Sequence, residues 1–165
     1  MTTADETQLR RLFGMKPLPE EGGYFVETYR SAAAVEQKGY AGKRSLCTAI
    51  YYMLTPTSYS ALHRLKGDEI FHFYAGDPLE LLQLFPDGSS DLITLGPEPL
   101  RGMKFQHVVP AGVWQGSRLL KGGRYALLGA TMAPGFEFED FTKGEVQSLI
   151  SMYPDRAELI SQLLR

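Results

Sequence analysis

Two side chains in one short stretch, residues 61–76, are the best candidates for chemistry: His63 and Glu69. An imidazole exchanges protons near neutral pH, and a neighbouring carboxylate orients it or exchanges a proton itself. Residues 66–68 (Lys-Gly-Asp) have turn character between two strand-like runs, so the stretch predicts a hairpin. Across its turn, Glu69 would hydrogen-bond His63, which describes both an oriented general base and an ordinary buried histidine. The residues leave both interpretations open.

Strand alternation separates the other candidates of this stretch into two groups. Glu69 and Phe73 fall on one face, whereas His72 falls on the other, and only a β-bulge would bring Glu69 and His72 into one pocket. A structural or interface role is therefore favoured for His72. Gln106 and His107 also alternate, so one of them is expected to point inward, and the sequence does not decide which.

The segments of the sequence that carry these side chains are predicted to be strands. Strand-length runs rich in aromatic, β-branched and leucine residues are separated by Pro, Gly and Asp at short intervals. The expected strands cover residues 24–29, 46–54, 58–65, 69–76, 79–85, 92–95, 113–120 and 124–132. No segment of helical period interrupts the runs from 46 to 132, so an all-β barrel or sandwich is predicted. Residues 31–44 are small and polar and are expected to form a mobile excursion.

Helices are expected only near the two ends. Residues 3–6 (Thr-Ala-Asp-Glu) form a capping-box pattern ahead of a short helix that stops at Gly14. Residues 142–145 (Thr-Lys-Gly-Glu) repeat that pattern, and Pro154 separates the helix that follows from a last one. These C-terminal helices are expected to pack on the outside of the barrel.

The composition limits the class of protein. Cys47 is the only cysteine, which excludes a disulfide within the chain and a cysteine-rich metal site. Seventeen Lys and Arg residues stand against nineteen Asp and Glu, without clusters that would suit a phosphate backbone. The N-terminal residues lack the apolar core of a signal peptide, and no run is long enough to cross a bilayer. A cytoplasmic protein is predicted, with neither nucleic acid nor a membrane as partner.

Two segments resemble the motifs of the cupin superfamily, G-x5-H-x-H-x3or4-E-x6-G and G-x5-P-x-G-x2-H-x3-N. The first His, the Glu and the closing Gly of the first motif correspond to His63, Glu69 and Gly76. Leu65 occupies the second His position. Residues 110–112 match P-x-G of the second motif, which places Gln115 at the third His position.

The resemblance to one branch, cupin family five, covers nearly the whole chain. Its characteristic phrases correspond to residues 21–25, 27–31, 63–65, 68–76, 106–115 and 133–138. This branch often has His-Pro ahead of Glu-Gly-Gly, whereas here residues 19–20 are Pro-Glu. The resemblance implies an all-β double-stranded β-helix, a jelly-roll barrel that is usually dimeric and has a pocket in its mouth. One domain, 1–165, is expected, with a barrel core of about 23–138 and C-terminal helices of about 143–164.

Cupin metal sites usually gather three His and one Glu around a transition metal. Here only His63 and Glu69 remain, because Leu65 is not a ligand and Gln115 offers a neutral amide oxygen. A metal-free polar pocket is therefore favoured. The alternative is a divalent transition metal held by His63, Glu69 and Gln115.

The leading hypothesis is a metal-independent isomerase or epimerase acting on a small polar, sugar-like molecule, by analogy with epimerases of this fold. His63 would be the base and Glu69 would orient it. The candidates for contact with the substrate are Gln115, Gln106, Tyr51, Phe73, Trp114 and His72, although most aromatic strand residues belong to cores. The alternatives are a metal-dependent cupin oxygenase or isomerase, and a non-enzymatic small-molecule binding domain.

A homodimer is expected from the pattern of two strands. Residues 46–54 and 79–85 are apolar on both faces, whereas a strand that faces water on one side should alternate apolar and polar residues. A short helix pair is not expected to cover both strands, and large exposed apolar patches are unusual on monomers. A second copy related by two-fold symmetry is the simplest cover.

Overall fold

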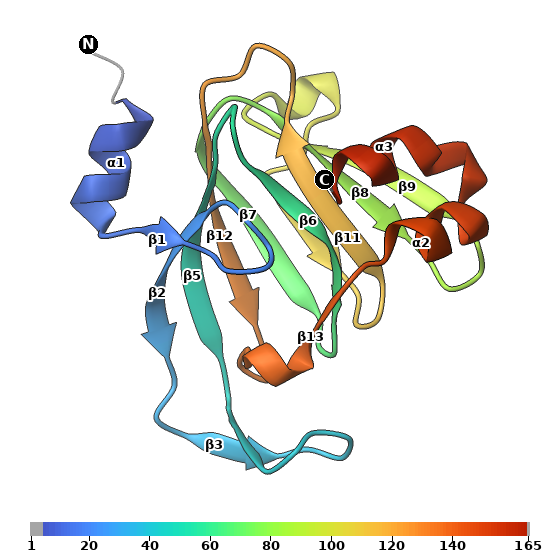
Figure 1. Ribbon diagram of the computed structural model, residues 1–165. Helices are drawn as coiled ribbons and strands as arrows, with labels where there is room; N and C mark the ends of the chain where they lie inside the picture. Colours follow the sequence, from blue (N-terminus) through green and yellow to red (C-terminus); the bar gives the residue numbers. More distant parts are fainter. Residues whose placement is uncertain (1–4, 165) are drawn as a thin grey trace.

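Two antiparallel sheets face each other in the computed structural model, which describes residues 5–164 (Figure 1). The six-stranded sheet has the order β1-β2-β5-β12-β7-β10, and the five-stranded sheet has the order β13-β6-β11-β8-β9. The strands of the first are β1 (Lys16–Pro17), β2 (Tyr24–Arg30), β5 (Thr48–Leu54), β12 (Ala126–Met132), β7 (Glu69–Gly76) and β10 (Gln106–Val109). Those of the second are β13 (Phe141–Lys143), β6 (Tyr59–Leu65), β11 (Trp114–Leu119), β8 (Leu79–Leu84) and β9 (Ser90–Leu95). The predicted all-β fold is confirmed.

The core lies between the two sheets because alternate side chains of each strand point inward. Phe71, Tyr52 and Leu128 from the six-stranded sheet pack in one cluster with Leu81 and Leu95 from the five-stranded sheet, and all five are 3% exposed or less. The interior is therefore apolar over most of its length. Polar side chains that enter it need partners or a ligand.

The helices lie outside the barrel, α1 on one side and α2 and α3 on the opposite side (Figure 1). They are α1 (Glu6–Phe13), α2 (Val146–Met152) and α3 (Ala157–Gln162), with 3₁₀ turns η1 (Pro99–Arg101), η2 (Phe138–Asp140) and η3 (Pro154–Arg156). Leu149 and Ile160 of the helix pair pack on Leu62 and Leu82, which confirms that these helices cover the barrel from outside. Among residues 5–164, none of the helices has the length and apolar character of a membrane span.

Both helix starts differ from the predicted capping boxes. Asp5 is the N-cap of α1, and Gln8 completes its capping box, two residues later than predicted; Thr3 lies outside the described residues. Glu145 caps α2 through its own carboxylate, while Thr142 belongs to β13. In each case an acidic side chain predicted to lie in the first helical turn, Asp5 or Glu145, caps the helix and accepts backbone N–H groups instead.

One predicted strand pairing is wrong, and one pair of strands was not predicted. β6 and β7 do not pair as a hairpin, because β6 belongs to the five-stranded sheet and β7 to the six-stranded sheet. The turn at residues 66–68 carries the chain across the barrel, so the two strands face each other over the interior. Residues 31–44, which were expected to form a mobile excursion, include β3 (Ala34–Glu36), which pairs with β4 (Lys43–Ser45) in a separate two-stranded ribbon.

Candidate functional site

A row of three polar side chains crosses the inner face of the five-stranded sheet. Gln115 on β11 is in register with His63 on β6 and with Gln83 on β8, and each is 1–2% exposed. Side chains that are directly opposite in neighbouring antiparallel strands lie on the same face, so the three are neighbours. The sequence predicted two of them, His63 and Gln115, in the interior.

Glu69, at the start of β7 on the opposite sheet, completes this interior group. Its Oε2 accepts a hydrogen bond of 2.7 Å from Nε2 of Gln115. Burial and the nearby charge of Glu21 raise the pKa of Glu69 to about 8, although the bond from Gln115 opposes the shift. Glu69 therefore holds its proton at neutral pH.

His63 does not pair with Glu69, contrary to the prediction. Its Nδ1 lies 2.7 Å from the carbonyl oxygen of Ala61, so Nδ1 carries the proton and donates it to this bond. Nε2 has no hydrogen-bond partner, and the carboxylate oxygen Oε2 of Glu21 lies 3.9 Å from it. The ring stacks on Phe141, with centroids 5.0 Å apart, which fixes its plane.

Glu21 is the residue of the site that sequence reasoning missed. Glu21 lies in the loop between β1 and β2. Its own backbone carbonyl accepts a 2.7 Å hydrogen bond from the amide of Ala61 on β6. Its carboxylate accepts a 2.8 Å bond from Ser60, and the hydroxyl of Tyr52 donates to the carbonyl of Gly22 next to it. Burial and the charge of Glu21 hold the pKa of Tyr52 well above its usual value. The Glu-Gly-Gly phrase was visible in the sequence, but it gave no sign of which distant strand the loop would meet.

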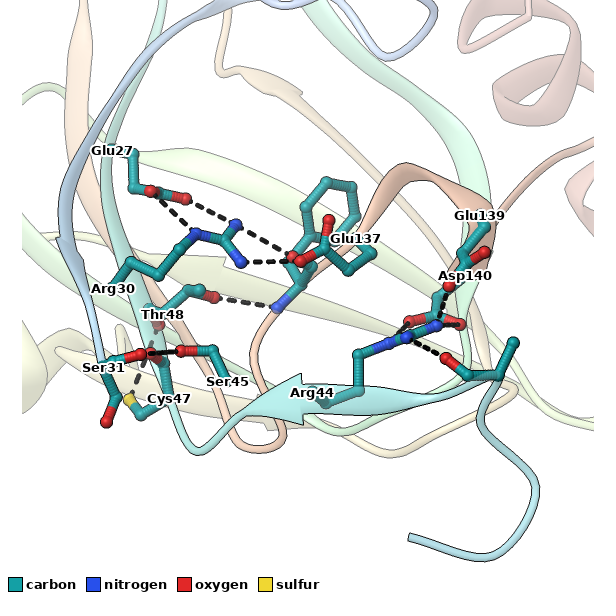
Figure 2. A network of polar contacts seen from close by, with 12 residues as sticks. Glu27, Arg30, Ser31, Arg44, Ser45, Cys47, Thr48, Glu137, Glu139 and Asp140 are labelled. Carbon is teal, nitrogen blue, oxygen red and sulfur yellow. Dashed lines mark hydrogen bonds and ion pairs between the residues drawn. The ribbon is translucent and has the colours of Figure 1, made fainter. Parts of the chain in front are cut away.

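Glu21 and Glu69 line a pocket of about 110 Å³ at one end of the barrel. Apolar walls of the pocket come from residues of both sheets and from Phe136 and Phe138, which precede β13. Its mouth carries an ion-pair group in which the guanidinium of Arg30 lies between two carboxylates, those of Glu27 and Glu137 (Figure 2). The pocket is smaller than the roughly 150 Å³ cavity that holds benzene in another protein, so it encloses only part of a sugar-sized molecule.

Several residues predicted to contact a substrate lie elsewhere. Tyr51 is on the outer face of the six-stranded sheet, between Phe13 and Tyr74, while Trp114 is on the outer face of the five-stranded sheet under Arg64. Strand alternation places them there, because the inward residues beside them are Tyr52 and Gln115.

His72 and Gln106 also lie on the outer face, where Nε2 of Gln106 donates a 3.1 Å bond to Nδ1 of His72. The predicted strand parity thus holds for His72. Phe73 is part of the apolar core, and His107, not Gln106, points inward. Nε2 of His107 donates a 2.6 Å bond to Gln83, and burial lowers the pKa of His107.

Comparison with known proteins identifies the family. Residues 7–143 match the family described as "Cupin superfamily (DUF985)". The chain belongs to the cupin superfamily. This confirms the resemblance that the motifs around His63 and Gln115 indicated.

Three proteins similar to this chain come from different organisms. An uncharacterized protein of Saccharomyces cerevisiae is 33% identical over 151 residues, which cover 83% of this chain and 75% of the yeast protein. A hypothetical protein from Leishmania major has a TM-score of 0.89 at 30% identity, covering 98% of this chain and 99% of its own. A Shewanella oneidensis protein also has a TM-score of 0.89, at 29% identity, with 99% of both chains covered.

A more distant likeness concerns the cupin fold alone. Oxalate decarboxylase of Bacillus subtilis superimposes with a TM-score of 0.55 at 16% identity, covering 90% of this chain and 37% of that enzyme. Together with the two facing antiparallel sheets, it supports the predicted jelly-roll barrel.

The Bacillus decarboxylase contains Mn(II) centres, so we tested whether this cupin site suits a metal. Among residues 5–164, no group of three or more His, Cys, Asp or Glu side chains is placed to share an ion. His63 supplies one imidazole, Leu65 supplies none, and the amide nitrogen of Gln115 is turned toward Glu69. These residues do not fit a metal centre built on several imidazoles.

Proposed function

We propose that the barrel binds a small polar, sugar-like molecule and acts on it as a metal-independent isomerase or epimerase. The observation that carries this proposal is the pair of glutamates in one pocket, Glu21 and Glu69, whose environments differ. The pKa of Glu69 is raised to about 8, while Glu21 accepts a hydrogen bond from Ser60 and faces the imidazole of His63. A carboxyl group that holds its proton at neutral pH, beside a second carboxyl group in a different environment, suits a general acid and a general base.

The reaction that fits this pair is proton transfer next to a carbonyl group. Glu21 would take the proton from the carbon atom beside the carbonyl, while Glu69 gives its proton to the carbonyl oxygen, forming an enediol. For isomerisation, Glu21 returns its proton to the former carbonyl carbon, while Glu69 takes the proton of the hydroxyl group on the carbon first deprotonated, which becomes the new carbonyl. For epimerisation, the enediol turns its other face to Glu21, which returns the proton to the same carbon while Glu69 takes back the proton of the enediol oxygen. Each carboxyl group recovers its starting state, so no further reactant is needed.

His63 takes a supporting part in this scheme, unlike in the sequence-based hypothesis. It does not line the pocket, whereas Glu21 does. Its Nε2 has no hydrogen-bond partner and lies 3.9 Å from the carboxylate of Glu21, so the ring packs beside that carboxylate and limits where it can lie. We therefore assign the substrate-contacting base to Glu21 and a positioning role to His63.

Exchange of carbon-bound hydrogen with solvent tests the proposal. The protein is incubated in heavy water with a panel of aldoses and ketoses, and loss of the signal of the hydrogen next to the carbonyl is followed by proton NMR. We expect exchange with at least one sugar. In Glu21→Gln and in Glu69→Gln the exchange rate should fall by roughly 100-fold or more. Glu98→Gln, which changes an exposed glutamate paired with Arg101, is the control and should exchange like the unmodified protein.

Other outcomes distinguish the alternatives. Sugar binding without exchange would contradict the isomerase and favour a non-enzymatic binding domain. Exchange that requires added divalent metal and stops with a chelator would favour the metal-dependent cupin. Unchanged exchange in both pocket variants would show that Glu21 and Glu69 are not the acid and base.

A further inference from the structure

The pocket has an excess of negative charge. Of the residues that line it, four are glutamates, Glu21, Glu27, Glu69 and Glu137, and the basic one is Arg30. Even with Glu69 protonated, the three remaining carboxylates outnumber the single guanidinium. Low-dielectric walls of Phe and Leu strengthen the field of such an excess on a ligand inside.

Arg30 is not available to hold an anion. Its Nε and Nη2 donate to the two carboxylate oxygens of Glu27 at 3.0 and 2.8 Å, and its Nη1 donates to Glu137 at 2.7 Å. Nη2 also donates to the carbonyl of Phe136 at 3.1 Å. Figure 2 shows the guanidinium turned toward these two carboxylates, so four of its five N–H groups are used within the protein. An arginine that binds a ligand carboxylate or phosphate needs a free two-pronged edge, which this one lacks.

Behind the pocket, a buried acceptor lacks a donor. The Nε2 lone pair of His63 has no hydrogen-bond partner, and the group that faces it is another acceptor, Oε2 of Glu21 at 3.9 Å. Oε1 of Gln115 is a second buried acceptor without a partner, because its amide nitrogen serves Glu69. The unpartnered donor of this row, Nε2 of Gln83, belongs to the next strand, on the far side of Gln115 from His63. Glu21 lines the pocket and has these unpartnered acceptors behind it, so the site favours a ligand that donates hydrogen bonds.

We propose that the ligand of this pocket is an organic cation, a hydroxylated primary ammonium of the amino-sugar or amino-alcohol class, and not a neutral or acidic sugar. Its N–H groups would donate to the carboxylates that line the pocket, and its charge would offset their excess. The rings of Phe25, Phe136 and Phe138 supply the aromatic faces that attract cations. The inference rests on the proposed function, because it takes the pocket beside Glu21 and Glu69 as the substrate site.

Three sugars of one ring size form the test. Glucosamine, glucose and glucuronate differ in carrying a positive, no or a negative charge, and their binding to the full-length protein is measured by titration calorimetry at neutral pH and low salt. We expect glucosamine to bind about tenfold or more tightly than glucose, and glucuronate to bind most weakly. The matched variants are Glu137→Gln and Glu98→Gln, since both glutamates are partly exposed and each is paired with one arginine. The preference for glucosamine should fall at least about threefold in the first and stay unchanged in the second.

The outcomes separate this inference from the proposed function. Equal binding of glucose and glucosamine, or a preference for glucuronate, would overturn the cationic ligand and leave proton transfer on neutral sugars standing. Glucosamine binding without exchange of its carbon-bound hydrogen in heavy water would support the cation and remove the isomerase. If none of the three sugars binds at millimolar concentration, the cationic ligand is overturned, and exchange across the wider panel of aldoses and ketoses decides the isomerase separately. A preference that Glu98→Gln lowers as much as Glu137→Gln would place the cation outside this pocket.

Discussion

The proton on Glu69 makes stability depend on pH. The folded protein holds this proton up to about pH 8, whereas a solvated glutamate releases it near 4.5. Between these values the folded state binds more protons than the unfolded state, so the free energy of unfolding falls as pH rises. The fall attributable to this group is on the order of 4 kcal/mol between about pH 5 and about pH 8. Glu69→Gln should remove most of it.

Urea unfolding at these two pH values measures the difference. The unmodified protein and the exposed control Glu98→Gln should both lose stability toward pH 8, while Glu69→Gln should give nearly equal free energies of unfolding at the two values. A slope in Glu69→Gln as steep as that of the unmodified protein would mean that Glu69 is ionised in the folded state.

Single residues of the site were partly predictable. The spacing of His63, Glu69 and Gln115 was enough to place all three in the interior, since motif position and strand parity are local properties of the sequence. Their partners were not predictable, because Glu21 reaches His63 from a loop 42 residues away, and only the folded chain brings them together. The inward side chain of the pair at 106 and 107 was likewise decided by the register of β10 against β7.

At the level of elements, the sequence located most strands and missed how they associate. Turn residues and apolar runs are local signals, which is why the strands now seen as β5, β8 and β12 were found. The pairing of β6 and β7 was wrong because a short polar connection also suits a crossing between two facing sheets. The β3–β4 ribbon was missed because its small polar residues lack strand periodicity and are held by tertiary contacts of Arg44.

Gly22 determines the conformation of the loop that carries Glu21. Its φ of +96° is a left-handed value, and a Cβ at this position would press on the carbonyl oxygen of Tyr59. Gly22→Ala should therefore cost roughly 2–4 kcal/mol and displace Glu21 from the pocket. Gly88→Ala is the control, because Gly88 has a similar φ of +88° but no neighbouring atom within 4 Å, and it should cost about 1 kcal/mol. Thermal unfolding and sugar binding of both variants are the measurements; equal losses would mean that contact with Tyr59 is not limiting.

Arg44 ties the segment before β13, which supplies part of the pocket wall, to β4. Its guanidinium is buried and lies 3.3 Å from the buried carboxylate of Asp140, and it also contacts Glu139 (Figure 2). Arg44→Met would leave Asp140 buried without its counter-ion, so we expect a clear drop in the melting temperature and weaker ligand binding. Arg101→Met removes an exposed pair and should change neither. Intact binding in Arg44→Met would show that this anchor does not shape the pocket.

For the whole molecule, the structure shows that one of the two strands on which the expected homodimer rests is covered within the chain. The helix pair α2–α3 covers Leu82 and Leu84 on the outer face of β8, so one of the two strands taken to need a partner chain is covered within the chain. On the six-stranded sheet, α1 covers part of the outer face through Phe13 on Tyr51. The remaining part of that face keeps Tyr29, Tyr74 and Val108 about half exposed. The exposed part of the six-stranded sheet is therefore the surface on which we expect a partner chain.

We propose that two copies associate through the outer face of the six-stranded sheet. Tyr29, Tyr74 and Val108 come from three strands of one sheet, and strand parity directs all three to the side away from the core. Light scattering at low micromolar concentration should give the mass of two chains. Val108→Lys places a charge in this face and should shift the mass toward one chain. Leu100→Lys, which changes a fully exposed leucine outside the sheets, should leave it unchanged. A single-chain mass for the unmodified protein would mean that α1 covers part of this face and that no second copy packs on the rest.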